Sequence, residues 1–164
     1  MSRPAQPIEL CLLRHAHAGD GATWVGDDEV RPLTEKGRRQ AERLGRLLAA
    51  AGYLPDAVLA SPLARARETA EIVADVLGLH ARIEARLGAP LDLATLDAIL
   101  DDAGEPRRPI IVGHDPDFSE IVSTLVGAPI RMRKATLARI DLERPLEPGA
   151  GDLIWLLPPD LLRG

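Results

Sequence analysis

The chain has 164 residues and a net charge of −5, and this length suits one domain with its own core. It contains no basic run and only four aromatic residues, which argues against nucleic-acid binding. The N-terminus lacks the pattern of a signal peptide, and no apolar run approaches the ~20 residues that cross a bilayer. We therefore expect one domain over residues 1–164, in the cytoplasm, with neither nucleic acid nor membrane as a partner.

Apolar and capping patterns predict alternating strands and helices. Residues 8–13 are apolar on both faces, which is typical of a buried strand. They include Cys11, the single cysteine, which we interpret as a buried free thiol. Thr34 has the side chain of an N-cap, and the apolar stripe of the helix that it opens ends at Gly52. Residues 57–60 form a second, short strand.

The next helix is predicted to begin at Ser61 and to end at Gly78, because serine is a good N-cap and Pro62 suits the first helical position. An apolar stripe predicts a third helix over residues 93–103. The strand that follows, residues 109–113, is again apolar throughout. Repeated strand–helix units of this kind are typical of a parallel sheet covered on both faces.

The pattern changes after a fourth helix, which Asp115 and Pro116 open and which ends at Gly127. Residues 136–142 alternate between apolar and polar, which predicts a half-exposed or edge strand. Residues 151–157 form a final apolar strand. We therefore predict an α/β fold, a three-layer α/β/α sandwich with a mostly parallel central sheet.

Reactive side chains stand at three strand-to-helix junctions. Arg14 and His15 follow the first strand, His114 follows the strand 109–113, and Arg65 lies four residues past the predicted N-cap after the second strand. The carboxyl ends of parallel strands open onto one crevice, where ligands bind. Guanidinium groups and helix N-termini favour anions there. These four residues therefore predict a phosphate pocket in which an imidazole can act as nucleophile.

Other residues near these junctions are interpreted more simply. The irregular stretch 18–33 follows the first strand and is expected to wall the site. His17 is interpreted as a loop residue that can line the pocket, and His80 as a surface residue. Positive charge from Arg14, Arg65 and protonated histidine leaves no clear ligand set for a metal.

Four motifs of this chain occur in order and at compatible spacing. They are Leu13-Arg14-His15-Ala16, Leu33-Thr34-Glu35-Lys36-Gly37, the stretch Ser61–Ala70, and Val112-Gly113-His114-Asp115-Pro116. Together they resemble the motifs of the histidine phosphatase superfamily, which is also called phosphoglycerate mutase-like. The short chain is most similar to the SixA-type phosphohistidine phosphatases. The resemblance extends from Leu10 to about Gly127, and the closing Trp155–Pro159 also fits.

The resemblance implies a phosphoglycerate mutase-like fold, with one histidine phosphatase domain over residues 1–164. It also implies a metal-independent phosphatase that needs no cofactor. His15 would be the nucleophile that becomes phosphorylated, while Arg14, Arg65 and His114 would bind the phosphoryl oxygens and stabilise the transition state. The partner would be a phosphorylated substrate, with a histidine-phosphorylated protein domain as one candidate.

The chain departs from the family pattern in two ways. The first motif usually reads Arg-His-Gly, whereas this chain has Ala16, which requires a non-glycine backbone conformation. Many members also carry a glutamate general acid in an insert, for which Asp20, Glu84 and Asp117 are weak candidates here. Glu84 is better interpreted as a solvated residue near an edge strand. A site without a placed acid should favour P–N over P–O substrates, since the leaving group of phosphohistidine is an imidazole.

Other functions stay open. A small-molecule phosphomonoesterase of the same superfamily would keep the chemistry and change the substrate. A mutase is disfavoured because the short chain leaves little room for a lid. A metal-dependent hydrolase is suggested by the i,i+2 spacing of His15 and His17, although Arg14 and Arg65 oppose a bound cation. A non-catalytic phosphoprotein-binding module is disfavoured by the presence of both histidines and both arginines.

Overall fold

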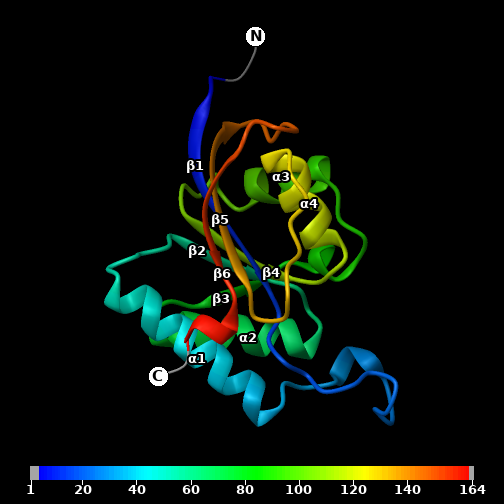
Figure 1. Ribbon diagram of the computed structural model, residues 1–164. Coiled ribbons are helices and arrows are strands. Elements are labelled where there is room, and N and C mark those ends of the chain that lie inside the picture. The colour runs from blue at the N-terminus through cyan, green and yellow to red at the C-terminus, as the bar shows by residue number, and fades with distance from the viewer. Residues whose placement is uncertain (1–3, 163–164) are drawn as a thin grey trace.

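Six strands form one sheet in the order β3-β2-β4-β1-β5-β6 in the computed structural model, which describes residues 4–162 (Figure 1). Their bounds are β1 Gln6–Arg14, β2 Ala57–Ala60, β3 Ala81–Ile83, β4 Pro109–Gly113, β5 Leu137–Arg144 and β6 Asp152–Leu157. The strands β3, β2, β4 and β1 are parallel, while β5 is antiparallel to both of its neighbours. The predicted α/β fold with a mostly parallel sheet is confirmed.

Four α-helices cover the two faces of the sheet (Figure 1). They are α1 Glu35–Ala50, α2 Ala64–Val76, α3 Leu93–Asp102 and α4 Asp117–Val126. Leu13 and Val112 point into the core beneath α1 and α2, whereas Leu12 and Ile111 point into the core beneath α3 and α4. Successive residues of a strand face opposite sides, so β1 and β4 serve both cores, and their sequences are therefore apolar throughout.

Three short 3₁₀ helices lie among the described residues: η1 Asp28–Val30, η2 Ala85–Gly88 and η3 Pro159–Leu162. The Thr34 hydroxyl caps α1 by accepting from the N–H of Gly37 at 3.2 Å, as predicted. Cys11 is a free, fully buried thiol, which confirms its interpretation, and burial raises its pKa to about 12. None of the helices within residues 4–162 has the length and apolar character of a membrane span.

The predicted start of the second helix is wrong by two residues. The helix α2 begins at Ala64, with Leu63 rather than Ser61 at the N-cap position. The Ser61 hydroxyl instead accepts from the N–H of Leu63 at 3.2 Å and lies 2.7 Å from Nε2 of His114. This serine closes a turn and contacts the site, so it does not cap the helix.

Residues 136–142 are predicted to form a half-exposed or edge strand. The edge position is wrong, because β5 lies between β1 and β6, whereas Arg139 and Asp141 are half-buried, in agreement with a half-exposed strand. Its polar residues contact charged and aromatic side chains. The Arg139 guanidinium bonds to Asp141 and Glu9 at 2.8–3.0 Å and lies 4.7 Å from the centroid of the Trp155 indole. The alternation in sequence thus reflects ion pairing within the sheet. The edge strands are β3 and β6, and the three residues of β3 are too few to show a period.

Candidate active site

Two histidines meet because β1 and β4 are parallel neighbours. Arg14 pairs in register with Gly113, so the next residues, His15 and His114, leave adjacent strand ends. The main-chain N–H of His15 donates to the carbonyl oxygen of Gly113 at 3.0 Å. The ring centroids of the two histidines lie 5.3 Å apart. The structure thus brings both predicted histidines into one site.

His15 is buried and held in one orientation. Its Nδ1 lies 2.8 Å from the carbonyl oxygen of Ala16. A carbonyl only accepts hydrogen bonds, so Nδ1 carries the proton and Nε2 keeps its lone pair. Burial lowers the pKa of His15 to about 3, and the positive charges of Arg65 and Arg14 add to this effect. The ring is therefore neutral at pH 7, as a nucleophile requires.

His114 is neutral for similar reasons. Burial is the main cause that lowers its pKa to about 4, followed by the charge of Arg65, while Asp117 acts in the opposite direction. The expectation that a protonated histidine supplies positive charge is therefore wrong for this arrangement. Arg14 and Arg65 provide that charge instead.

The two arginines are held at their terminal nitrogens. Nη1 of Arg14 donates to the carbonyl oxygen of Met132 at 2.9 Å and lies 3.8 Å from the Asp115 carboxylate. Nη1 of Arg65 donates to the carbonyl oxygen of Asp28 at 2.9 Å, and its Nη2 lies 3.1 Å from the carboxylate of the same residue. In both arginines Nε is buried and has no hydrogen-bond partner among the described residues. Buried donors of this kind are costly unless an acceptor meets them, so both are suited to an oxyanion.

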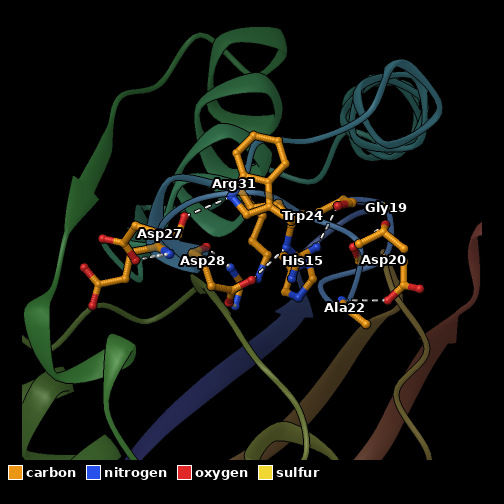
Figure 2. Close-up of polar contacts among 12 residues, drawn as sticks. His15, Gly19, Asp20, Ala22, Trp24, Asp27, Asp28 and Arg31 are labelled. Atoms are coloured by element: carbon orange, nitrogen blue, oxygen red, sulfur yellow. Dashed lines mark hydrogen bonds and ion pairs between the residues drawn. The ribbon is translucent and has the colours of Figure 1, made fainter.

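Asp28 belongs to the stretch 18–33, which runs along the site; Figure 2 shows its labelled residues around His15. Asp28 also accepts from Nε of Arg31 at 2.9 Å. This residue could not be identified from the sequence, because its contact with Arg65 depends on the path of an irregular loop. The available signal was the run of acids Asp27-Asp28-Glu29 within the segment expected to wall the site.

Two of the carboxylates predicted as acid candidates bond to other groups. Asp20 accepts from the N–H of Ala22 at 2.9 Å in the loop (Figure 2). Glu84 follows the edge strand β3, as expected, and both of its oxygens bond to Arg86, at 2.7 and 2.9 Å. Neither forms a hydrogen bond with His15 or His114 within the described residues, so the structure does not bring them to the pair of histidines.

The third candidate, Asp117, lies closer to the site. Its charge therefore raises the pKa of His114. Its Oδ2 accepts from the N–H of Leu91 at 2.9 Å. Asp117 and His114 both line a hollow of about 290 Å³, whose apolar walls include Leu63, Leu91 and Phe118.

The remaining predicted residues have ordinary surroundings. Nδ1 of His17 lies 2.7 Å from the Thr34 hydroxyl, and His80 is exposed, as predicted. Within residues 4–162, no group of three or more His, Cys, Asp or Glu side chains is placed to hold a metal ion. Ala16 is buried with a negative φ, and its N–H donates to Thr69 Oγ1 at 3.0 Å. The alanine therefore fits where the family motif has glycine.

Comparisons with known proteins agree with this geometry. The family model described as the histidine phosphatase superfamily (branch 1) matches residues 10–88. An uncharacterised protein of Picosynechococcus sp. is 33% identical over 135 residues, which cover 78% of this chain and 81% of that protein.

Solved structures extend the similarity over the whole sheet. The protein histidine phosphatase SixA complexed with tungstate has a TM-score of 0.81 and 25% identity, covering 95% of this chain and 100% of that one. A putative α-ribazole-5′-P phosphatase from Escherichia coli K-12 has a TM-score of 0.73 and 20% identity, covering 93% and 98%. The second likeness shows a shared fold.

Proposed function

This chain belongs to the histidine phosphatase superfamily, and on that premise we propose that it hydrolyses phosphohistidine through a covalent intermediate on His15, without a metal ion or cofactor. Members of the superfamily are phosphatases or mutases. The proposal is carried by one observation: a neutral, oriented His15 shares its site with two arginines whose buried Nε donors have no partner in residues 4–162. Phosphoryl transfer needs this combination of nucleophile and oxyanion donors.

In the first step, Nε2 of His15 forms a bond to phosphorus. The P–N bond of the substrate breaks, its electron pair goes to the leaving imidazole, and that imidazole takes a proton from solvent. Arg14 and Arg65 bind the phosphoryl oxygens and stabilise the charge of the transition state. The approaching phosphoryl group also raises the pKa of His114, because a nearby negative charge favours the protonated ring.

In the second step, water attacks the phosphorus of phospho-His15. A new P–O bond forms, the P–Nε2 bond breaks, and its electron pair returns to the ring of His15. Both protons of the water stay with the product, which leaves as dihydrogen phosphate. The histidine is then neutral again, with its proton on Nδ1 as before.

The carboxylates of the site support a P–N substrate. An alkoxide leaving group needs a proton donor, and such help is typically worth ~10²–10⁴-fold. The hydrogen bond from Arg31, and then the charge of Arg65, lower the pKa of Asp28, so this carboxylate is ionised at neutral pH. Asp20, Glu84 and Asp117 accept hydrogen bonds from other groups. An imidazole leaving group does not need such an acid.

Exposed side chains near the site support a protein as substrate. Trp24 and Val25, in the loop that carries Asp28, are 39% and 90% exposed. Arg131 and Arg133 are exposed on either side of Met132, whose carbonyl holds Arg14, and neither forms an ion pair within the described part of the chain. Tryptophan and arginine are enriched in protein interfaces.

A comparison of leaving groups tests the substrate class. We expect faster hydrolysis of a histidine-phosphorylated protein, and of phosphoramidate, than of glycerol phosphate. Asp20→Asn, Glu84→Gln and Asp117→Asn should each change the rate on phosphoramidate by less than about threefold, because the P–N substrate needs no general acid. Efficient turnover of glycerol phosphate that is lost in one of these variants contradicts the proposal.

The hollow beside His114 favours one second candidate, a small-molecule phosphomonoesterase. The organic group of a small phosphate ester fits a space of about 290 Å³ with apolar walls, and Asp117 lies there as a potential acid. In that case Asp117→Asn should lower turnover of the ester by ~10²-fold or more and leave phosphoramidate hydrolysis unchanged.

A further inference from the structure

One residue, Asp28, binds one edge of the Arg65 guanidinium. The main-chain oxygen of Asp28 accepts from Nη1 at 2.9 Å, and its carboxylate lies 3.1 Å from Nη2. A guanidinium has five N–H donors in a fixed fork, so these contacts leave Nε and the second hydrogen of Nη2 on the neighbouring edge. Nε is buried without a partner in the described residues. The free edge can bind two oxygens of one phosphoryl group.

Arg14, at the end of β1, is held in a similar way to Arg65, which lies in α2. Its Nη1 is held by a main-chain carbonyl, that of Met132, and lies near a carboxylate, that of Asp115. Its Nε is likewise buried and without a partner in residues 4–162. Two arginines from separate elements thus have their ends held and their Nε groups kept for another acceptor.

Asp28 is itself fixed in place. Nε of Arg31 donates to Asp28 Oδ1 at 2.9 Å, and Nη1 of Arg31 donates to the carbonyl oxygen of Ala18 at 2.6 Å. Arg31 is 9% exposed and Arg65 is 8% exposed, so both guanidinium groups are shielded from water. The carboxylate therefore bridges two buried cations and ties the loop to the start of α2.

We propose that Asp28 is a positioning residue for phosphoryl transfer, which fixes the guanidinium of Arg65 so that its Nε edge meets the phosphoryl oxygens. The inference rests on the proposed function of the site and adds the residue that orients its second arginine. Asp28 acts through Arg65 alone and transfers no proton. The loop thus contributes to the phosphate pocket without touching the reacting atoms.

The test compares Asp28→Ala with Glu29→Ala, a control in the same short helix whose side chain forms no hydrogen bond or ion pair within residues 4–162. Substrates are p-nitrophenyl phosphate and phenyl phosphate, which differ in the basicity of the leaving group. Asp28→Ala should lower kcat/KM about 10–100-fold, and by the same factor on both, because a misplaced donor costs less than a deleted one, typically 10²–10³-fold. Asp28→Asn keeps an oxygen acceptor and should stay within about fivefold of the wild type.

A double-mutant cycle separates action through Arg65 from an independent role. In an Arg65→Ala background, Asp28→Ala should change kcat/KM by less than about twofold, since residues that act as a unit are not additive. A full further loss in the double variant overturns the proposal. Thermal melts of every variant show whether the fold is intact.

Two other results also overturn it. Tighter vanadate binding with undiminished turnover in Asp28→Ala means that the carboxylate competes with phosphate. A much larger loss on phenyl phosphate than on p-nitrophenyl phosphate means that Asp28 donates a proton. Failure of the proposed function would give a different result from failure of this inference. In that case the wild type would form no phosphoenzyme, or His15→Ala would stay fully active.

Discussion

The ring of Phe118 packs against the α-carbon of Gly113 so closely that a β-carbon at position 113 would lie 2.6 Å from the ring. Side chains essentially never approach one another to that distance, so only glycine allows α4 to lie this near the end of β4. His114 is the next residue and stands between these two elements. The glycine of the Val112–Pro116 motif thus has a packing role that helps to fix where His114 lies.

His15 is expected to form the phosphoenzyme, because its Nε2 lone pair is available at pH 7. Brief reaction with a ³²P-labelled substrate, followed by denaturation, should leave an acid-labile, base-stable phosphoryl group on the chain. His15→Ala should lose the label and at least ~10³-fold in turnover, as deletion of a nucleophile does. Unchanged labelling of the variant would assign the intermediate to another residue.

Arg65→Ala should lower turnover by on the order of 10²–10³-fold, because it removes a preorganised donor to the transition state. Arg67→Ala on the same helix is the matched control, since Arg67 pairs with Glu71 and is about half exposed. The control should keep its activity, and both variants should melt near the wild-type temperature. Full activity of Arg65→Ala would place the start of α2 outside the site.

The depressed pKa of His15 makes stability depend on pH. The folded chain takes up this proton only near pH 3, whereas the unfolded chain takes it up below about pH 6.5. The unfolded state therefore binds more protons in that window, and the free energy of unfolding decreases as pH falls from 6.5 towards 3. Urea melts at pH 7.5 and pH 5 should show a larger loss for the wild type than for His15→Gln. Equal losses would mean that His15 titrates normally.

Activity should survive removal of metal ions. Arg14 and Arg65 supply positive charge, and no metal-binding group of three or more side chains lies within the described residues. Dialysis against EDTA, followed by an assay in metal-free buffer, should leave the rate unchanged. A loss of activity that zinc or magnesium restores would favour the metal-dependent hydrolase.

The exposed arginines beside Met132 should matter only for a large substrate. Arg131→Ser together with Arg133→Ser should raise KM for a histidine-phosphorylated protein about 10-fold, because interface arginines often carry a kilocalorie or more. The KM for phosphoramidate should change less than about twofold, as exposed charges are screened by salt. Arg39→Ser together with Arg46→Ser, at two exposed arginines of α1, removes the same net charge and is the matched control. Equal effects on both substrates would indicate a general electrostatic change.

The arrangement of the two histidines could be predicted from the sequence, because it follows from strand order and direction. Apolar runs identified β1 and β4, and parallel strands deliver the residues after their carboxyl ends to one edge. The predicted position of Arg65 at a strand-to-helix junction does not depend on the error of two residues in the start of α2, since a shift of the N-cap leaves the junction in place.

Asp28 and the central position of β5 could not be predicted, for a common reason. In both cases, a largely buried arginine pairs with an acidic residue that lies far away in the sequence, and a hydropathy pattern does not show such pairs. Asp28 meets Arg65 across 37 positions of sequence, and Arg139 meets Glu9 across 130. Contacts of that range depend on the finished tertiary structure.

The two tryptophans occupy different environments, and this gives the protein a built-in optical reporter. Trp155 of β6 packs edge-on against Tyr53, while Trp24 lies in the loop with its indole N–H donating to the Asp27 carbonyl oxygen at 3.0 Å. A Trp155→Phe variant would therefore emit from the loop alone. Its fluorescence would report, in real time, any movement of the loop at Asp28 when an anion binds to Arg65.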